Sequence, residues 1–179
     1  MKRRTGFTLI ELLIVIAILG ILATIVILTI NPTQKLAQTR DAGRQTTISQ
    51  LGHTLASYSA AHEGRFPAED STWITTLVDA EGLVIVPPGV NYSVAGKSSC
   101  VLNRQPTDNG WCYDATGGGG DGPVITYARL ESDILHSSCP NPLSDAAWFV
   151  YSTSQGRAGI VCTPDASTEP VAGSQNFVN

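Results

Sequence analysis

The sequence is poor in charged residues, and basic residues are especially few. Only 15% of the 179 residues are charged, with 11 Lys plus Arg against 15 Asp plus Glu and a formal net charge of −4. Proteins that bind nucleic acid through a basic surface need clustered Lys and Arg to neutralise phosphates. The composition therefore argues against nucleic acid as a partner. A hydrophobic content of 42% argues equally against a disordered chain.

The sequence also lacks the short motifs of common enzymes and metal sites. It contains no G-x-S-x-G, no H-E-x-x-H and no C-x-x-C, which are the patterns of serine hydrolases, zinc proteases and many zinc sites. His53, His62 and His136 have no metal-ligand spacing. The preferred interpretation is a protein that is not an enzyme. An exported, membrane-anchored enzyme whose Ser, His and Asp meet only in the fold is the alternative.

Much of the aliphatic content is concentrated in one apolar run near the N-terminus. Leu12–Ile30 carries no charge, and about 20 helical residues suffice to cross a hydrocarbon core of roughly 30 Å. Because basic residues precede the run, the positive-inside rule places residues 1–6 in the cytoplasm and the chain beyond the run outside. The run is too long for a secretory signal and ends without an A-x-A-like site. We predict a single-pass membrane precursor, with a cleaved secretory signal as the alternative.

Glu11 is the single charged residue between Phe7 and Ile30. Ionisable groups within a membrane are costly and are functional hypotheses by default. The other interpretation is a shallow position near a helix N-terminus, where the helix dipole favours an anion. Both interpretations hold if the helix begins at Phe7, because a new amino group there could pair with Glu11 of a neighbouring chain.

A short motif stands at the start of the apolar run, after a basic leader, and reads GFTLIEL from Gly6 to Leu12. It resembles the processing site of type IV prepilins and type II secretion pseudopilins. The resemblance implies that a prepilin peptidase cuts after Gly6, that the new N-terminal Phe7 is N-methylated, and that Glu11 acts in filament assembly. Many family members carry a Pro near the end of the apolar run, whereas here Pro32 comes a few residues later.

An amphipathic stretch follows the apolar run. Its apolar residues recur at helical spacing, and they are Ile48, Leu51, Leu55 and Tyr58. We predict a transmembrane and filament-core helix over residues 7–32 and an amphipathic continuation over residues 33–65, with a kink near Pro32. A Tyr followed by G-x-[YF]-P at the helix end also resembles pilins and major pseudopilins.

Residues 66–179 are predicted to form a small globular domain. Short β-branched or aromatic stretches between turn residues predict an antiparallel sheet, and they are Asn91–Val94, Trp111–Tyr113, Val124–Leu130, Trp148–Ser152 and Ala158–Cys162. A short helix over Thr72–Ala80, capped by Ser71, is predicted before them. The fold class is α+β, a long N-terminal helix packed on a small C-terminal antiparallel sheet, as the resemblance to pilins implies.

Four cysteines lie on the predicted exported side, where disulfides persist. They are Cys100, Cys112, Cys139 and Cys162, and three pairings are open to them. We favour Cys100–Cys112 and Cys139–Cys162, because each pair closes a local loop. A zinc site is the alternative, and both the missing C-x-x-C and an oxidising compartment disfavour it.

A glycine-rich stretch between Asp114 and Asp121 is most simply a flexible hairpin loop. These two carboxylates make a calcium site the alternative, since oxygen ligands on a flexible backbone suit Ca²⁺. No other cofactor is predicted.

The predicted function is that of a structural subunit. The precursor is stored in membrane lipid, processed by prepilin peptidase, and added at an inner-membrane assembly platform to a helical homopolymer with related minor pilins. A type IV pilus, for adhesion or motility, is preferred because the long loops and disulfide potential suit an extracellular fibre. The main alternative is the envelope pseudopilus of a type II secretion system. A competence pseudopilin would need a basic patch on the outer domain.

Overall fold

The computed structural model describes residues 6–81, 91–96, 100, 110–165 and 167–178. The chain forms two compact units, Met1–Leu36 and Ala37–Asn179. A long apolar helix comes first, and a six-stranded sheet of mainly antiparallel pairs lies in the C-terminal unit. This arrangement confirms the predicted α+β fold class.

Two helices make up the first third of the chain, and Asn31 separates them. Helix α1 spans Leu9–Ile30 and helix α2 spans Pro32–Ala61. Asn31 adopts the left-handed conformation (φ 46°, ψ 74°), which Asn tolerates better than most residues. Pro32 suits the first position of α2, because the backbone N–H that it lacks would have no intrahelical partner there. The helical hydrogen bonding is therefore interrupted beside the proline where the sequence predicts a kink.

The sheet has its strands in chain order, β1 to β6. The strands are β1 (Asn91–Val94), β2 (Gly110–Ala115), β3 (Val124–Arg129), β4 (Ala146–Ser152), β5 (Arg157–Thr163) and β6 (Phe177–Val178). All neighbouring pairs are antiparallel except β1 and β2, which run parallel. The sequence predicts antiparallel pairing throughout. The parallel pair is possible because residues 95–109 are enough chain for a crossover connection, which a tight hairpin cannot provide.

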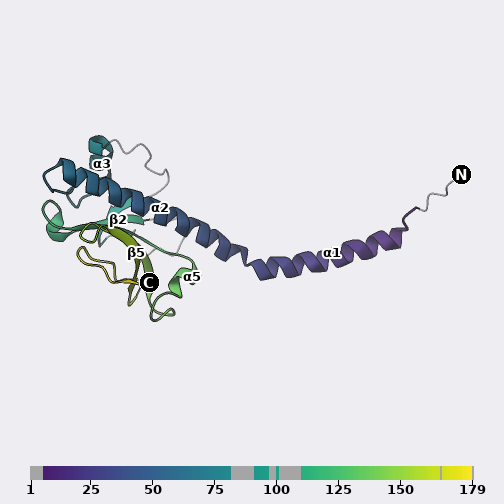
Figure 1. Ribbon diagram of the computed structural model, residues 1–179. Coiled ribbons are helices and arrows are strands. Elements are labelled where there is room, and N and C mark those ends of the chain that lie inside the picture. The colour runs from purple at the N-terminus through teal and green to yellow at the C-terminus, as the bar shows by residue number, and fades with distance from the viewer. Residues whose placement is uncertain (1–5, 82–90, 97–99, 101–109, 166, 179) are drawn as a thin grey trace. The chain divides into compact units, whose positions relative to one another are not determined.

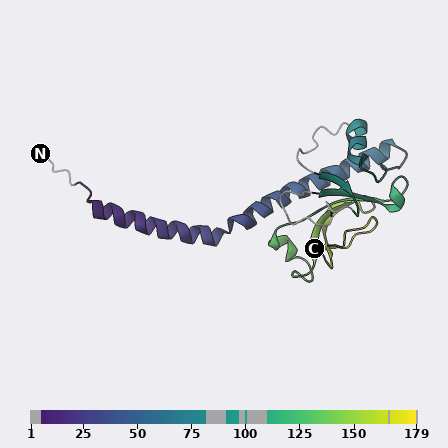
Figure 2. The same cartoon turned by 180° about the vertical axis from the view of Figure 1, so that it is seen from behind.

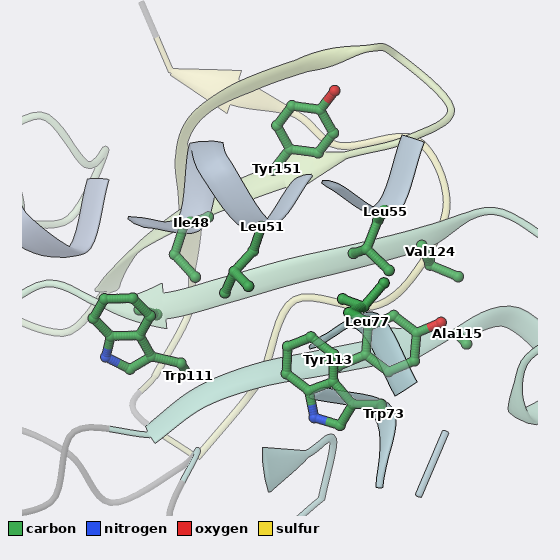
Figure 3. Packing of buried hydrophobic residues seen from close by; sticks show 11 residues of the cluster. Ile48, Leu51, Leu55, Trp73, Leu77, Trp111, Tyr113, Ala115, Val124 and Tyr151 are labelled. Atoms are coloured by element: carbon green, nitrogen blue, oxygen red, sulfur yellow. The ribbon is translucent and has the colours of Figure 1, made fainter. Parts of the chain in front are cut away.

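Helix α2 covers one face of the sheet. Helix α3 (Trp73–Glu81) lies beside the C-terminal half of α2 (Figure 1). Figure 3 shows Ile48, Leu51 and Leu55 of α2 directed toward the strands. All three are buried together with Trp73 and Tyr113, whose rings stack at 4.9 Å between centroids. The amphipathic face predicted from the sequence is thus the face that closes the hydrophobic core.

The chain that leads into β6, residues 167–176, covers the other face of the sheet (Figure 2). Ala172 and Phe177 pack against the buried cluster that contains Tyr127 and Trp148. Polar contacts add to this packing, because the Glu169 carboxylate accepts the Tyr127 hydroxyl at 3.1 Å. Both faces of the sheet are therefore shielded, by α2 on one side and by an extended segment on the other.

A buried cluster of charges joins α2 to the chain after β3. Asp41 accepts the backbone N–H groups of Glu131 and Ser132 at 2.9 and 2.8 Å. Arg44 pairs with Asp41 at 2.9 Å and with Glu131, and these three side chains are at most 5% exposed. Arg40 also binds Glu131, at 2.7 Å. Buried charges are tolerable only when they are paired and hydrogen-bonded, so this cluster fixes where α2 crosses the sheet.

Candidate functional site

The first turn of α1 is closed by reciprocal hydrogen bonds between Thr8 and Glu11. Thr8 has an extended backbone (φ −81°, ψ 151°), and its Oγ1 accepts the backbone N–H of Glu11 at 3.3 Å. The Glu11 carboxylate accepts the backbone N–H and the hydroxyl of Thr8, each at 2.8 Å. This capping box satisfies donors that a helix start leaves unpaired. The Glu11 carboxylate, at the start of an apolar helix, therefore has hydrogen-bond partners within its own chain.

Gly6 and Phe7 lie immediately before this turn, and both are exposed. Phe7 is 80% exposed, so the Gly6–Phe7 bond lies at the surface of the N-terminal unit. An amino group released at Phe7 would lie one residue from the capping threonine. The three residues singled out by the sequence thus lie at the start of α1, while their roles in cleavage, methylation and assembly stay predictions.

Thr8 is the residue at this site that the sequence analysis missed. Its signal is the T-x-x-E spacing ahead of an apolar run, which is the sequence pattern of a capping box. The motif GFTLIEL contains that spacing at Thr8 and Glu11. A search for helix starts would therefore have found the hydrogen-bond partner of Glu11.

Helix α1 has no buried residue, and beyond Glu11 large apolar side chains are exposed on every side of it. In the part of the chain that the structure describes, it is the one helix long and apolar enough to cross a membrane. A helix that is apolar on every side needs an apolar environment on every side. Lipid or other apolar helices can supply that environment.

The cysteines form two pairs in the structure, Cys100–Cys112 and Cys139–Cys162. Their Cα atoms are 6.0 and 5.7 Å apart, within the range that a disulfide requires. These are the two local pairs that the sequence analysis favoured. The first pair joins β2 to the chain beyond β1, and the second joins β5 to the chain beyond helix α5 (Asp133–His136).

Asp114 and Asp121, the weak calcium candidates, each have a different protein partner. The Asp114 carboxylate accepts the backbone N–H of Ala172, and Asp121 lies 3.5 Å from the Arg65 guanidinium. Among the residues that the structure describes, no group of three or more His, Cys, Asp or Glu is arranged to hold a metal ion. Calcium binding stays a prediction.

The glycine-rich loop between these aspartates is tied to the chain that follows α2. The backbone N–H of Phe66 donates to the Gly120 carbonyl at 2.9 Å, and that of Glu69 donates to the Gly118 carbonyl at 3.0 Å. A Cβ on Gly119 would lie 2.7 Å from the Ala68 Cα. The loop therefore needs glycine for close backbone contact as well as for its left-handed angles.

Comparison with known proteins finds one family. Its description is "Prokaryotic N-terminal methylation motif", and it matches residues 1–27. A search of curated proteins and a search of solved structures each find no match. The matched segment contains the predicted cleavage site, the capping box and most of α1. Residues 1–27 therefore carry the N-terminal signature of type IV pilins and pseudopilins.

Proposed function

We propose that this protein is a structural subunit of a type IV filament. Prepilin peptidase removes residues 1–6, Phe7 is N-methylated, and the mature subunit polymerises through α1. The observation that carries the proposal is the match of residues 1–27 to the methylation motif. The same motif favours a structural subunit over an enzyme.

The exposed apolar surface of α1 supports polymerisation. Before assembly, lipid would cover this surface, and in the filament the α1 helices of neighbouring subunits would cover it. Because lipid tails are about as apolar as aliphatic side chains, the exchange need not expose α1 to water. The inner-membrane assembly platform would then extract the subunit without a large hydrophobic cost.

Glu11 would provide the register of each added subunit. In the single chain the Thr8 cap satisfies the carboxylate. In the filament the methylated amino group of Phe7 on a neighbour would add an opposite charge. A buried carboxylate is costly without such a partner and tolerable with one, so a subunit added out of register would be disfavoured.

We propose a type IV pilus as the filament, with the type II secretion pseudopilus as the second candidate. Two cysteine pairs and a sheet covered on both faces suit a domain at the surface of an extracellular fibre. A pseudopilus would keep the same subunit within the envelope.

Immuno-electron microscopy of intact cells, with antibody to residues 110–165, tests this proposal together with an intact mass of the labelled protein. We expect long labelled surface fibres whose subunit begins at Phe7. A processed subunit confined to the envelope would replace the pilus by the pseudopilus, and deletion should then block export of another protein. An unprocessed chain would contradict both.

A further inference from the structure

The peptide bond that prepilin peptidase would cut lies just before the first turn of α1. Gly6, Phe7 and Thr8 are not helical, and the helix begins at Leu9. A single further helical turn, about 3.6 residues, would enclose the Gly6–Phe7 bond. The position of the helix start therefore decides whether this bond lies in a helix or in an extended segment.

Thr8 holds the helix start in its place. Its backbone is extended, with ψ at 151°, which turns the chain away from the helical path. The Thr8 hydroxyl accepts the backbone N–H of Glu11 at 3.3 Å, and the Thr8 N–H donates to the Glu11 carboxylate at 2.8 Å. In a longer helix both N–H groups would instead bond the carbonyls four residues earlier. The capping bonds therefore compete directly with extension of the helix.

The cap acts against a tendency of α1 to lengthen. In apolar surroundings a backbone N–H without a partner is costly, and a longer helix supplies partners for such groups. Gly6 also opposes extension, because glycine is a poor helix former, while Phe7 is an ordinary one. Of the residues Gly6, Phe7 and Thr8, only Thr8 has a side chain that can form hydrogen bonds. Loss of its hydroxyl should therefore shift the balance toward the longer helix.

A peptidase requires the bond that it cuts to be accessible. In a helix the N–H and carbonyl groups beside a peptide bond are occupied by helical hydrogen bonds. Proteolysis therefore concentrates in exposed segments outside regular structure, and extended peptides are commonly recognised through their free backbone groups. Gly6 is exposed and Phe7 is 80% exposed, both outside the helix. The cap thus leaves the Gly6–Phe7 bond in a conformation that can enter an active site.

We propose that Thr8 is a positioning residue for processing, because its cap keeps the Gly6–Phe7 bond extended for prepilin peptidase. This inference rests on the proposed function, in which that bond is cut. The two halves of the capping box then have separate roles, since the Thr8 hydroxyl positions the cut site while the Glu11 carboxylate serves assembly. The Thr8 hydroxyl bonds the backbone N–H of Glu11, so this bond persists when the Glu11 side chain is removed.

Cleavage kinetics of the full precursor in lipid nanodiscs, with purified prepilin peptidase, test this role, and intact mass follows the loss of residues 1–6. We expect Thr8→Val to raise KM about two- to fivefold with kcat unchanged, because only the extended fraction of the substrate binds. A change of about fivefold corresponds to ~1 kcal/mol, the usual contribution of a cap. Thr8→Ser keeps the hydroxyl and should match the unaltered chain.

Thr24→Val is the matched control, because the Thr24 hydroxyl donates to the Gly20 carbonyl at 2.9 Å farther along the same helix. This variant should leave KM unchanged. Carbon-13 chemical shifts of Gly6 and Phe7, measured by nuclear magnetic resonance in the same nanodiscs, report whether these residues are helical. We expect helical shifts to increase in Thr8→Val and to stay unchanged in the control.

The inference fails if Thr8→Val is cut with the KM of the unaltered chain, or if Thr8→Ser is impaired as much as Thr8→Val. It also fails if KM rises while Gly6 and Phe7 stay non-helical, because the peptidase would then recognise the Thr8 side chain directly. An unaltered precursor that is not cut at the Gly6–Phe7 bond would instead contradict the proposed function itself.

Discussion

Gly43 and Gly52 lie in the same helix and have opposite surroundings. A Cβ on Gly52 would lie 2.0 Å from Cγ of Tyr151, whereas a Cβ on Gly43 would have nothing within 4 Å. Alanine normally stabilises a helix by about 1 kcal/mol relative to glycine. At Gly52 the overlap should reverse that sign, because a packed ring on β4 cannot move aside cheaply.

We predict that Gly52→Ala lowers the free energy of unfolding by about 1–3 kcal/mol, the usual cost of overpacking. Gly43→Ala, the matched control, should raise it by up to ~1 kcal/mol. Urea unfolding of both full-length variants, followed by circular dichroism, measures the two changes. Equal effects of the two substitutions would show that α2 does not approach β4 as closely as described.

We predict that Glu11→Ala leaves the protein processed and membrane-bound but poorly assembled. The substitution removes the carboxylate that caps α1 and that would pair with the amino group of a neighbour. The yield of sheared filaments measures assembly, and intact mass confirms processing. Asp79→Ala is the control, since it removes an exposed acid of α3. A filament yield equal to that of the unaltered protein would refute the pairing role.

At the residue scale, the sequence identified those candidate functional residues that lie in one continuous motif. Gly6, Phe7 and Glu11 are contiguous with a basic leader and an apolar run, so one motif identifies them. Helix α3 begins at Trp73, one residue after the predicted start, and the Asp70 carboxylate accepts the backbone N–H of Thr72 at 2.7 Å in the turn before it. The exact start of a helix depends on backbone angles that the sequence does not show.

The contact between α2 and the chain after β3 depends on the buried charge cluster. We predict that Glu131→Gln lowers the free energy of unfolding by about 3–5 kcal/mol, because the guanidinium groups of Arg40 and Arg44 would then share the cluster with a single carboxylate, that of Asp41. Chemical denaturation of the full chain measures the loss.

Asp121→Asn is the matched control for Glu131→Gln. It breaks the exposed pair with Arg65, and exposed pairs contribute about 0–1 kcal/mol. If both variants lose a similar free energy of unfolding, burial does not determine how much the charge cluster stabilises the fold.

At the element scale, local sequence patterns predicted where strands lie better than they predicted contacts between distant parts of the chain. The β1 range agrees with the sequence prediction, and β5 extends it by one residue at each end. The two-residue strand β6 was not predicted, because Phe177–Val178 is too short to show alternation. The charge cluster was also missed, since its members on α2 and after β3 are about ninety residues apart.

Burial raises the pKa of three tyrosines of the sheet. Loss of solvation raises the pKa of Tyr92 to about 12, and it also raises the pKa values of Tyr113 and Tyr127. Nearby acids add to the effect, since Glu169 faces Tyr127 and Glu69 faces Tyr113. An unfolded tyrosine ionises near pH 10. Above that pH the native state therefore holds more protons than the unfolded state.

We predict that the whole domain loses stability as the pH rises from about 10 to 12. The three neutral rings contribute full stability below pH 10, and this contribution declines as the unfolded chain releases their protons. Tyrosinate absorbance at alkaline pH should increase together with the loss of circular dichroism. A gradual absorbance rise near pH 10 in a chain that keeps its native spectrum would contradict this prediction.

The strand order of the sheet has a consequence for how the domain folds. Each strand from β2 onward pairs with the strand made just before it, so pairing never waits for a strand still to be synthesised. Contacts that are close in the chain form fast, because little loop entropy is lost. The sheet can therefore grow one strand at a time along the chain, and few strand edges stay open to other chains.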